Sequence, residues 1–66
     1  MEVIKFNKKI YTLKAVKKAV EEFKNLANFT IKELDGYFEV KIDKIDQEVK
    51  DVIKDEFANY ALGLMS

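Results

Sequence analysis

The 66-residue sequence has no cysteine, histidine, proline or tryptophan. Without cysteine, the chain forms no disulfide and offers no thiolate metal ligand. Without histidine, it also lacks the most common metal ligand and the usual general base. A chain this short buries only roughly 60% of its unfolded surface, so we expect its stability to depend on tight packing or on association.

Long apolar runs are missing as well. No stretch approaches the roughly 20 apolar residues of a membrane-spanning helix, and the first residues, 1–5, resemble neither the basic nor the apolar part of a signal peptide. The length leaves room for a single domain, residues 1–66. Together with the lack of cysteine, these features predict a cytoplasmic protein.

The sequence also has no arginine, and all twelve basic residues are lysines. Base-specific contacts rely on bidentate arginine, so this composition argues against sequence-specific recognition of nucleic acid. Residues 1–33 hold eight lysines and four glutamates (net +4), and residues 34–66 hold four lysines and eight acids (net −4). This polarity fits the steering of a partner or head-to-tail pairing, and it also fits an ordinary solvated surface.

The first half of the chain predicts a strand and then a helix. Residues 2–6 favour a strand because three of the five are β-branched or aromatic. Ile10-Tyr11 reads either as a short second strand or as the lead into the helix. Thr12 is a good N-cap, and an end near residues 25–28 is indicated by asparagines that favour a left-handed cap. Apolar residues recur between these limits at helical spacing, at positions 13, 16, 20, 23 and 27.

The middle of the chain predicts a β-hairpin. Apolar and polar residues alternate over residues 29–32 and again over residues 37–43, which indicates strands with one buried and one wet face. Asp35-Gly36 between two such runs is the strongest short hairpin signal. We expect a type I′ turn there, with positive φ at both central residues.

A second helix is predicted from Asp46, which is placed as its N-cap. The complete order is then strand, helix, hairpin, helix, which predicts an α+β fold: a two-layer sandwich of an antiparallel sheet with two helices on one face. The helix is expected to bury Val49, Val52, Ile53, Phe57, Tyr60 and Leu64. The sheet is expected to bury Ile4, Phe6, Phe29, Ile31, Phe38, Val40 and Ile42.

The end of this second helix breaks the amphipathic pattern. At about 100° per residue, Ala58, Leu62 and Met65 fall on the side opposite the core stripe. Earlier in the helix that side carries charged residues, so the polar face becomes apolar in the last two turns. We interpret these three residues as a self-association or partner surface, and the alternative is a frayed helix end. Tyr37, on the outer face of the hairpin, is a further candidate for interaction on a docking face or a sheet edge.

Three other groups of charged residues have simpler explanations than a site. The acidic run from Asp43 to Asp51 lacks the glycine of a calcium loop, and helix capping explains it. Asp51 and Asp55 are one turn apart but interleaved with lysines, which does not favour acid–base chemistry. A cluster of five lysines near Tyr11 is a weak indication of single-stranded nucleic-acid binding. These lysines are Lys8, Lys9, Lys14, Lys17 and Lys18.

A family resemblance adds to this interpretation. Tyr11 before a helix that carries Ala19 and Phe23, then a hairpin and an aromatic-rich last helix, resemble the HxsD family. These are small accessory proteins of His-Xaa-Ser systems, which are associated with the modification of a ribosomal peptide by radical-SAM proteins. The family's C-terminal signature is similar to Leu-Leu-Asn-Asp-Tyr-x-Leu-Arg.

This chain matches that signature only in part. Phe57, Tyr60 and Leu62 can be laid on its apolar, tyrosine and second leucine positions. Asn59 stands one place later than the family's asparagine, and Gly63 stands where the arginine is expected. The resemblance implies a non-enzymatic helper of peptide modification.

We therefore expect a small, non-catalytic protein-interaction module without catalytic, cofactor or metal residues. Its function would be that of an accessory protein in radical-SAM peptide modification. The alternatives are a structural homodimer that uses the same apolar residues, and a weak nucleic-acid binder that uses the lysine cluster. No membrane association and no small-molecule ligand is predicted.

Overall fold

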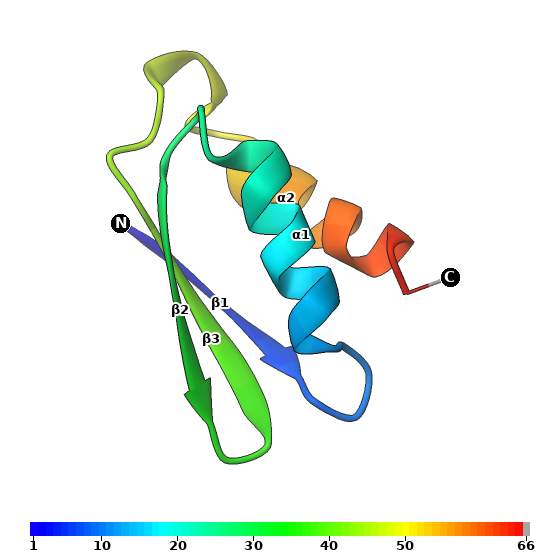
Figure 1. Ribbon diagram of the computed structural model, residues 1–66. Helices are drawn as coiled ribbons and strands as arrows, with labels where there is room; N and C mark the ends of the chain where they lie inside the picture. The colour runs from blue at the N-terminus through cyan, green and yellow to red at the C-terminus, as the bar shows by residue number, and fades with distance from the viewer. Residues whose placement is uncertain (66) are drawn as a thin grey trace.

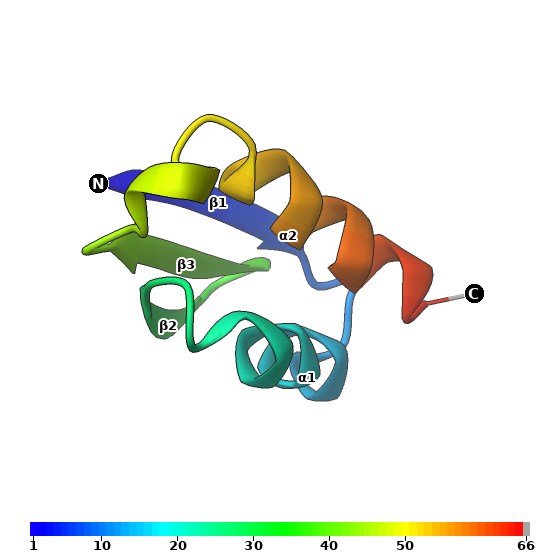
Figure 2. The same cartoon turned by 90° about the horizontal axis from the view of Figure 1, so that it is seen from above.

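The computed structural model describes residues 1–65, which form a three-stranded antiparallel sheet with two α-helices on one of its faces (Figure 1). Seen from above, α2 lies nearer β1 and α1 lies nearer β2 (Figure 2). This arrangement confirms the predicted α+β fold. The elements are β1 (Glu2–Asn7), α1 (Leu13–Phe23), β2 (Asn28–Leu34), β3 (Tyr37–Asp43), a short 3-10 helix η1 (Gln47–Val49) and α2 (Ile53–Gly63).

The sheet has the order β1-β3-β2, so the second strand of the hairpin is central. Val40 of β3 lies between Ile4 of β1 and Ile31 of β2, and all three side chains share the face beneath the helices. Every strand residue expected to face inward does so. Phe6, Phe38, Val40 and Ile42 are buried, and Ile4, Phe29 and Ile31 are half-buried against the same core.

The hairpin forms where it was predicted, but the expected type I′ turn is wrong. Leu34 pairs with Tyr37, which leaves Asp35 and Gly36 as the two-residue loop. Of these two loop residues, only Gly36 has a positive φ, at 80°. A type II turn needs positive φ at its third residue alone, and glycine adopts that conformation without steric cost.

Ile10-Tyr11 leads into the helix and does not form a second strand. The amide groups of both residues donate hydrogen bonds to the Asn7 carbonyl oxygen, at 3.0 and 2.9 Å, and close a tight turn. The Tyr11 ring then packs edge-on against Phe6, with ring centroids 4.8 Å apart. This segment therefore joins the end of β1 to the start of α1 through an aromatic contact.

The first helix begins as predicted and ends early. The Thr12 hydroxyl oxygen accepts a hydrogen bond from the Ala15 amide at 3.1 Å, which is the expected N-cap. The helix ends at Phe23 and not near residues 25–28, because residues 24–26 form a turn and β2 begins at Asn28.

The second helix starts later than predicted. Asp46 is an N-cap, but of η1, where its Oδ1 accepts from the Glu48 amide at 3.0 Å. A turn at residues 50–52 then separates η1 from α2 and interrupts the regular rotation of 100° per residue. As a result Val52 is 48% exposed and is not part of the buried stripe.

The buried stripe of α2 is formed by Ile53, Phe57 and Ala61, at a spacing of four residues. Phe57 is fully buried at its centre, with the rings of Phe6, Phe23 and Phe29 at centroid distances of 5.9, 5.6 and 4.9 Å. Both helices and the sheet therefore meet around one aromatic side chain.

Neither helix of the described chain reaches the length and apolar character that a bilayer crossing requires.

Candidate functional site

Ala58, Leu62 and Met65 lie along one flank of α2 and its final turn, and we refer to them as the α2 patch. Leu62 is 52% exposed, while Ala58 and Met65 are half-buried. Residues three and four positions apart are neighbours on a helix surface, so the three side chains are contiguous. The patch lies beside the stripe that packs Phe57 and Ala61 into the core.

Met65, the last residue of the patch, contacts both α2 and the beginning of α1. Met65 lies beyond the end of α2, and its amide donates a hydrogen bond to the Leu62 carbonyl oxygen at 3.0 Å. Its sulfur lies 4.0 Å from the hydroxyl oxygen of Thr12, the cap of α1. The C-terminal end of α2 therefore lies beside the beginning of α1.

A groove of about 230 Å³ lies at this junction of the two helices. Ala15 and Leu64 give it apolar surface, and Lys14 and Lys18 contribute charge from α1. Thr12 also lines it and touches Met65, so the groove adjoins the α2 patch. We refer to these five lining residues as the helix groove.

The sequence did not indicate this groove. The sequence pattern predicts that Leu64 belongs to the core stripe of α2, and it groups Lys14 and Lys18 with the other lysines near Tyr11. The groove depends on the position of Leu64 beside the first turns of α1, and helical spacing does not predict where two helices meet. A signal was present in Ala15, a small side chain in the first turn of a helix, which leaves room for a neighbour.

Tyr37 lies apart from the α2 patch. Phe38 points into the core beneath the helices, so Tyr37, the preceding residue of β3, faces the opposite side of the sheet. The Lys5 ammonium lies 5.1 Å from the centre of its ring, which is a cation–π contact. The structure therefore places the candidate interaction residues on two separate faces.

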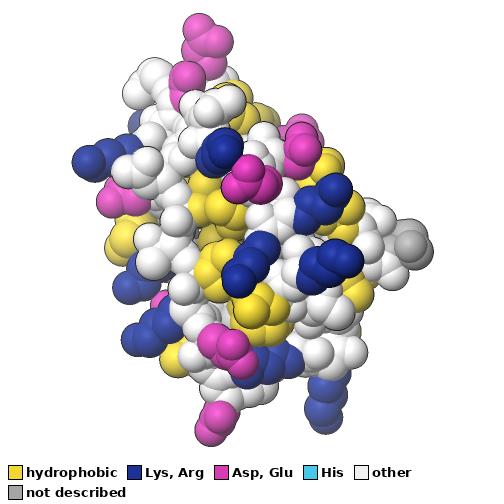
Figure 3. All heavy atoms as spheres, in the orientation of Figure 1, with side chains coloured by type: hydrophobic (Ala, Val, Ile, Leu, Met, Phe, Trp, Pro, Cys, Tyr) yellow, Lys and Arg dark blue, Asp and Glu magenta, His cyan; other side chains and the backbone are white. Residues whose placement is uncertain are grey.

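The lysine cluster is also divided. The Lys8 ammonium forms an ion pair with Glu33 at 2.8 Å and lies 5.3 Å from the centre of the Phe38 ring. Lys14, Lys17 and Lys18 are exposed on α1. Figure 3 shows basic side chains gathered over this helix, with apolar side chains between them.

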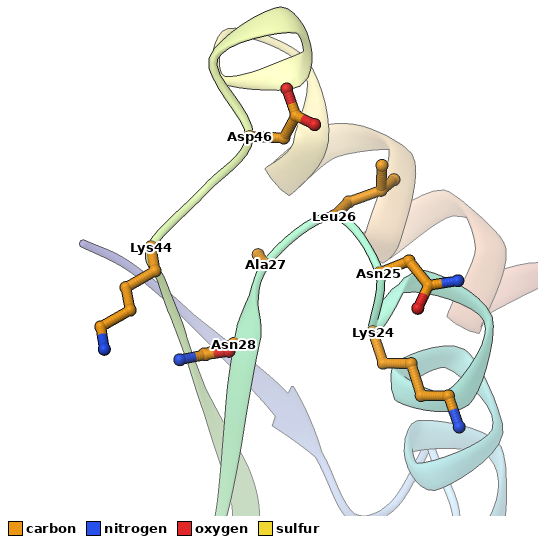
Figure 4. Close-up of a pocket in the computed structure, with 7 residues that line it drawn as sticks. All are labelled: Lys24, Asn25, Leu26, Ala27, Asn28, Lys44 and Asp46. Carbon is orange, nitrogen blue, oxygen red and sulfur yellow. The ribbon is translucent and has the colours of Figure 1, made fainter.

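A second, more polar hollow lies where α1 leads into β2 (Figure 4). The Asp46 amide donates a hydrogen bond to the Leu26 carbonyl oxygen at 2.8 Å, which links the two chain segments that border the hollow. Lys24 and Asn25 point to one side, whereas Lys44 and Asn28 point to the other. Because these polar groups diverge, the hollow presents no converging set of donors to a ligand.

The acidic residues remain apart from one another. Asp51 and Asp55 are both exposed, and the Asp46 carboxylate is engaged in capping η1. Within residues 1–65, no three acidic side chains come close enough together to hold a metal ion.

No protein-family model matches this chain, and no curated protein or solved structure shows significant similarity to it. The surface of the molecule is therefore the guide to its function.

Proposed function

We propose that this chain is a small, non-catalytic protein-interaction module that binds its partner through the α2 patch. The observation that carries the proposal is the exposure of Leu62, 52%, on a helix whose other side is fully buried. Clustered apolar surface on a small domain is typical of interaction sites, whereas single exposed apolar residues carry no such meaning.

The contacts of Met65 support this proposal against the alternative of a frayed helix end. Fraying leaves terminal side chains without tertiary neighbours, but Met65 is half-buried and lies against Thr12. Its amide also donates a hydrogen bond to the Leu62 carbonyl oxygen. An ordered apolar surface exposes the same area in every molecule, as a partner site requires.

The test compares Leu62→Lys with Val52→Lys. Val52 is the N-cap residue directly before α2 and is 48% exposed, so the two changes place the same charge at similarly exposed positions near opposite ends of this helix. We expect Leu62→Lys to weaken partner binding by about tenfold or more, as loss of a central apolar contact does. Val52→Lys should leave it unchanged, and both variants should remain folded by circular dichroism.

Light scattering over a range of concentrations separates the proposal from a structural homodimer. If the chain binds a different protein through the α2 patch, the wild-type chain alone should be monomeric. A wild-type dimer that Leu62→Lys converts to a folded monomer would assign the patch to self-association and contradict the proposal. Equal loss of partner binding in both variants would also contradict it, because the effect would then not belong to the patch.

The resemblance to the HxsD family extends the proposal to a role as an accessory in radical-SAM peptide modification. Support comes from the order of strand, helix, hairpin and helix, and from the position of Tyr11 just before Thr12, the N-cap of α1. We expect the gene to lie beside genes for a radical-SAM protein and a short repeat peptide. We further expect that radical-SAM protein to bind wild type and to bind Leu62→Lys about tenfold more weakly. Genes of neither kind nearby would remove this extension and leave the interaction module standing.

A further inference from the structure

The helix groove lies at the positive end of α1. The first turn of this helix contains no acidic residue, although acids there would offset the positive end of the helix dipole. It carries Lys14 instead, and Lys18 follows one turn later on the same side. Positive charge therefore accumulates along one wall of the groove.

Neither lysine is neutralised within the described chain. The ion pairs among residues 1–65 join Lys8 to Glu33 and Lys24 to Glu21. No acid stands three or four positions from Lys14 in the sequence, and Glu22 is the one acid on α1 left for Lys18. The carbonyl end of α2 offers about half a negative charge, which the amide end of α1 cancels. About two positive charges remain beside an apolar surface.

The size of the groove favours a side chain over a small-molecule ligand. Its volume of about 230 Å³ is below the roughly 300–1,000 Å³ of most small-molecule sites. Leu64 is half-buried and offers an apolar surface for one aliphatic or aromatic side chain, and Ala15, which is itself buried, lines the groove beside it. None of the described residues that line the groove is aromatic, whereas proteins that bind single-stranded nucleic acid stack the bases on aromatic rings. A peptide therefore fits better than a nucleic acid.

We propose that the helix groove binds an acidic segment of the partner protein. One apolar side chain of the segment lies on Ala15 and Leu64, and its carboxylates lie beside Lys14 and Lys18. This inference rests on the proposed interaction function and names the chemistry of the partner. Because Thr12 lines the groove and lies against Met65, the helix groove and the α2 patch form one continuous binding surface.

The test uses three synthetic peptides with the same leucine positions at helical spacing and with glutamate, glutamine or lysine between them. Fluorescence polarisation measures affinity, and amide chemical shifts report where each peptide lies. We expect the glutamate peptide to bind most tightly, with its largest shifts at Thr12, Ala15 and Leu64. Its affinity should also fall as salt is added, because exposed ion pairs are screened.

The matched variants are Lys14→Glu/Lys18→Glu and Lys32→Glu/Lys41→Glu. Both change the net charge equally, but Lys32 and Lys41 are exposed on the sheet face away from the helices. In the first variant, the reversal of two exposed charges should weaken binding of the glutamate peptide by roughly tenfold. The second variant should bind it like wild type.

Several results would overturn the inference. They are equal affinity for the glutamate and glutamine peptides, shifts confined to the sheet, or displacement of the peptide by a single-stranded oligonucleotide. Shifts of groove residues that depend on protein concentration without peptide would assign the groove to a second copy of the chain, and would also overturn it. If the groove variant keeps full partner affinity while Leu62→Lys loses it, the inference fails and the proposed function stands. If neither the groove variant nor Leu62→Lys loses partner affinity, both the inference and the proposed function are contradicted.

Discussion

Thr12 is the residue on which several parts of the molecule meet. Its hydroxyl caps α1 by accepting from the Ala15 amide, it lies against the Met65 sulfur, and it lines the helix groove. The N-cap could be predicted from the sequence because it depends on neighbours three residues apart. The contact with Met65 could not, since it joins residues at opposite ends of the chain and depends on the path of α2.

We expect Thr12→Ala to lower the free energy of unfolding by about 1 kcal/mol, the usual cost of losing an N-cap hydroxyl. For a domain of this size, that corresponds to a melting temperature lower by about 4–8 °C. Thr12→Ser keeps the hydroxyl and should melt close to wild type. Thermal unfolding by circular dichroism checks both variants, and equal melting temperatures for Thr12→Ala and wild type would contradict the capping role.

Among the elements, the hairpin shows what a sequence pattern can and cannot specify. Alternation predicted its strands and its buried residues because one face of the sheet is covered by helices. The turn type depends on one dihedral angle at Asp35, which Asp-Gly permits with either sign. The start of α2 escaped prediction for a related reason, since Asp46 caps a 3-10 turn as readily as an α-helix.

The turn offers a direct test. Because Asp35 does not have positive φ, Asp35→Pro should keep the fold and raise the free energy of unfolding by about 0.4–1 kcal/mol. Gly36→Ala should lower it by about 1–2 kcal/mol, since alanine at a φ of 80° is strained even though its Cβ meets no atom within 4 Å. Urea unfolding measures both changes, and an unfolded Asp35→Pro variant would point back to a type I′ turn.

At the scale of the whole molecule, stability depends on one small core without disulfides or buried polar side chains among the described residues. Phe57 touches rings from β1, α1 and β2, so it connects every layer of the fold. The sequence indicated Phe57 as a core residue from its spacing. Its central position follows from the packing of three elements and lies beyond what spacing predicts.

Phe57→Ala should therefore leave the chain largely unfolded. The substitution costs about 3–5 kcal/mol, which matches the roughly 3–5 kcal/mol that a core of this size supplies. Loss of amide shift dispersion in the NMR spectrum is the expected result. Phe57→Leu, which keeps most of the volume, should stay folded with a lower unfolding midpoint. A cooperative Phe57→Ala variant with the wild-type midpoint would show that the core does not depend on this ring.

The position of β3 at the centre of the sheet also sets the order in which the sheet assembles. The β2–β3 hairpin closes through a two-residue loop, an event of about 1–10 μs. Pairing of β1 with β3 brings Asn7 opposite Tyr37, so it closes a much longer loop at a higher entropic cost. During synthesis on the ribosome, β1 emerges before β3 and has no strand to pair with until β3 has emerged. We therefore expect the nascent chain to pass through a half-sheet in which one side of β3 is vacant, and β1 is the segment that later pairs with that side.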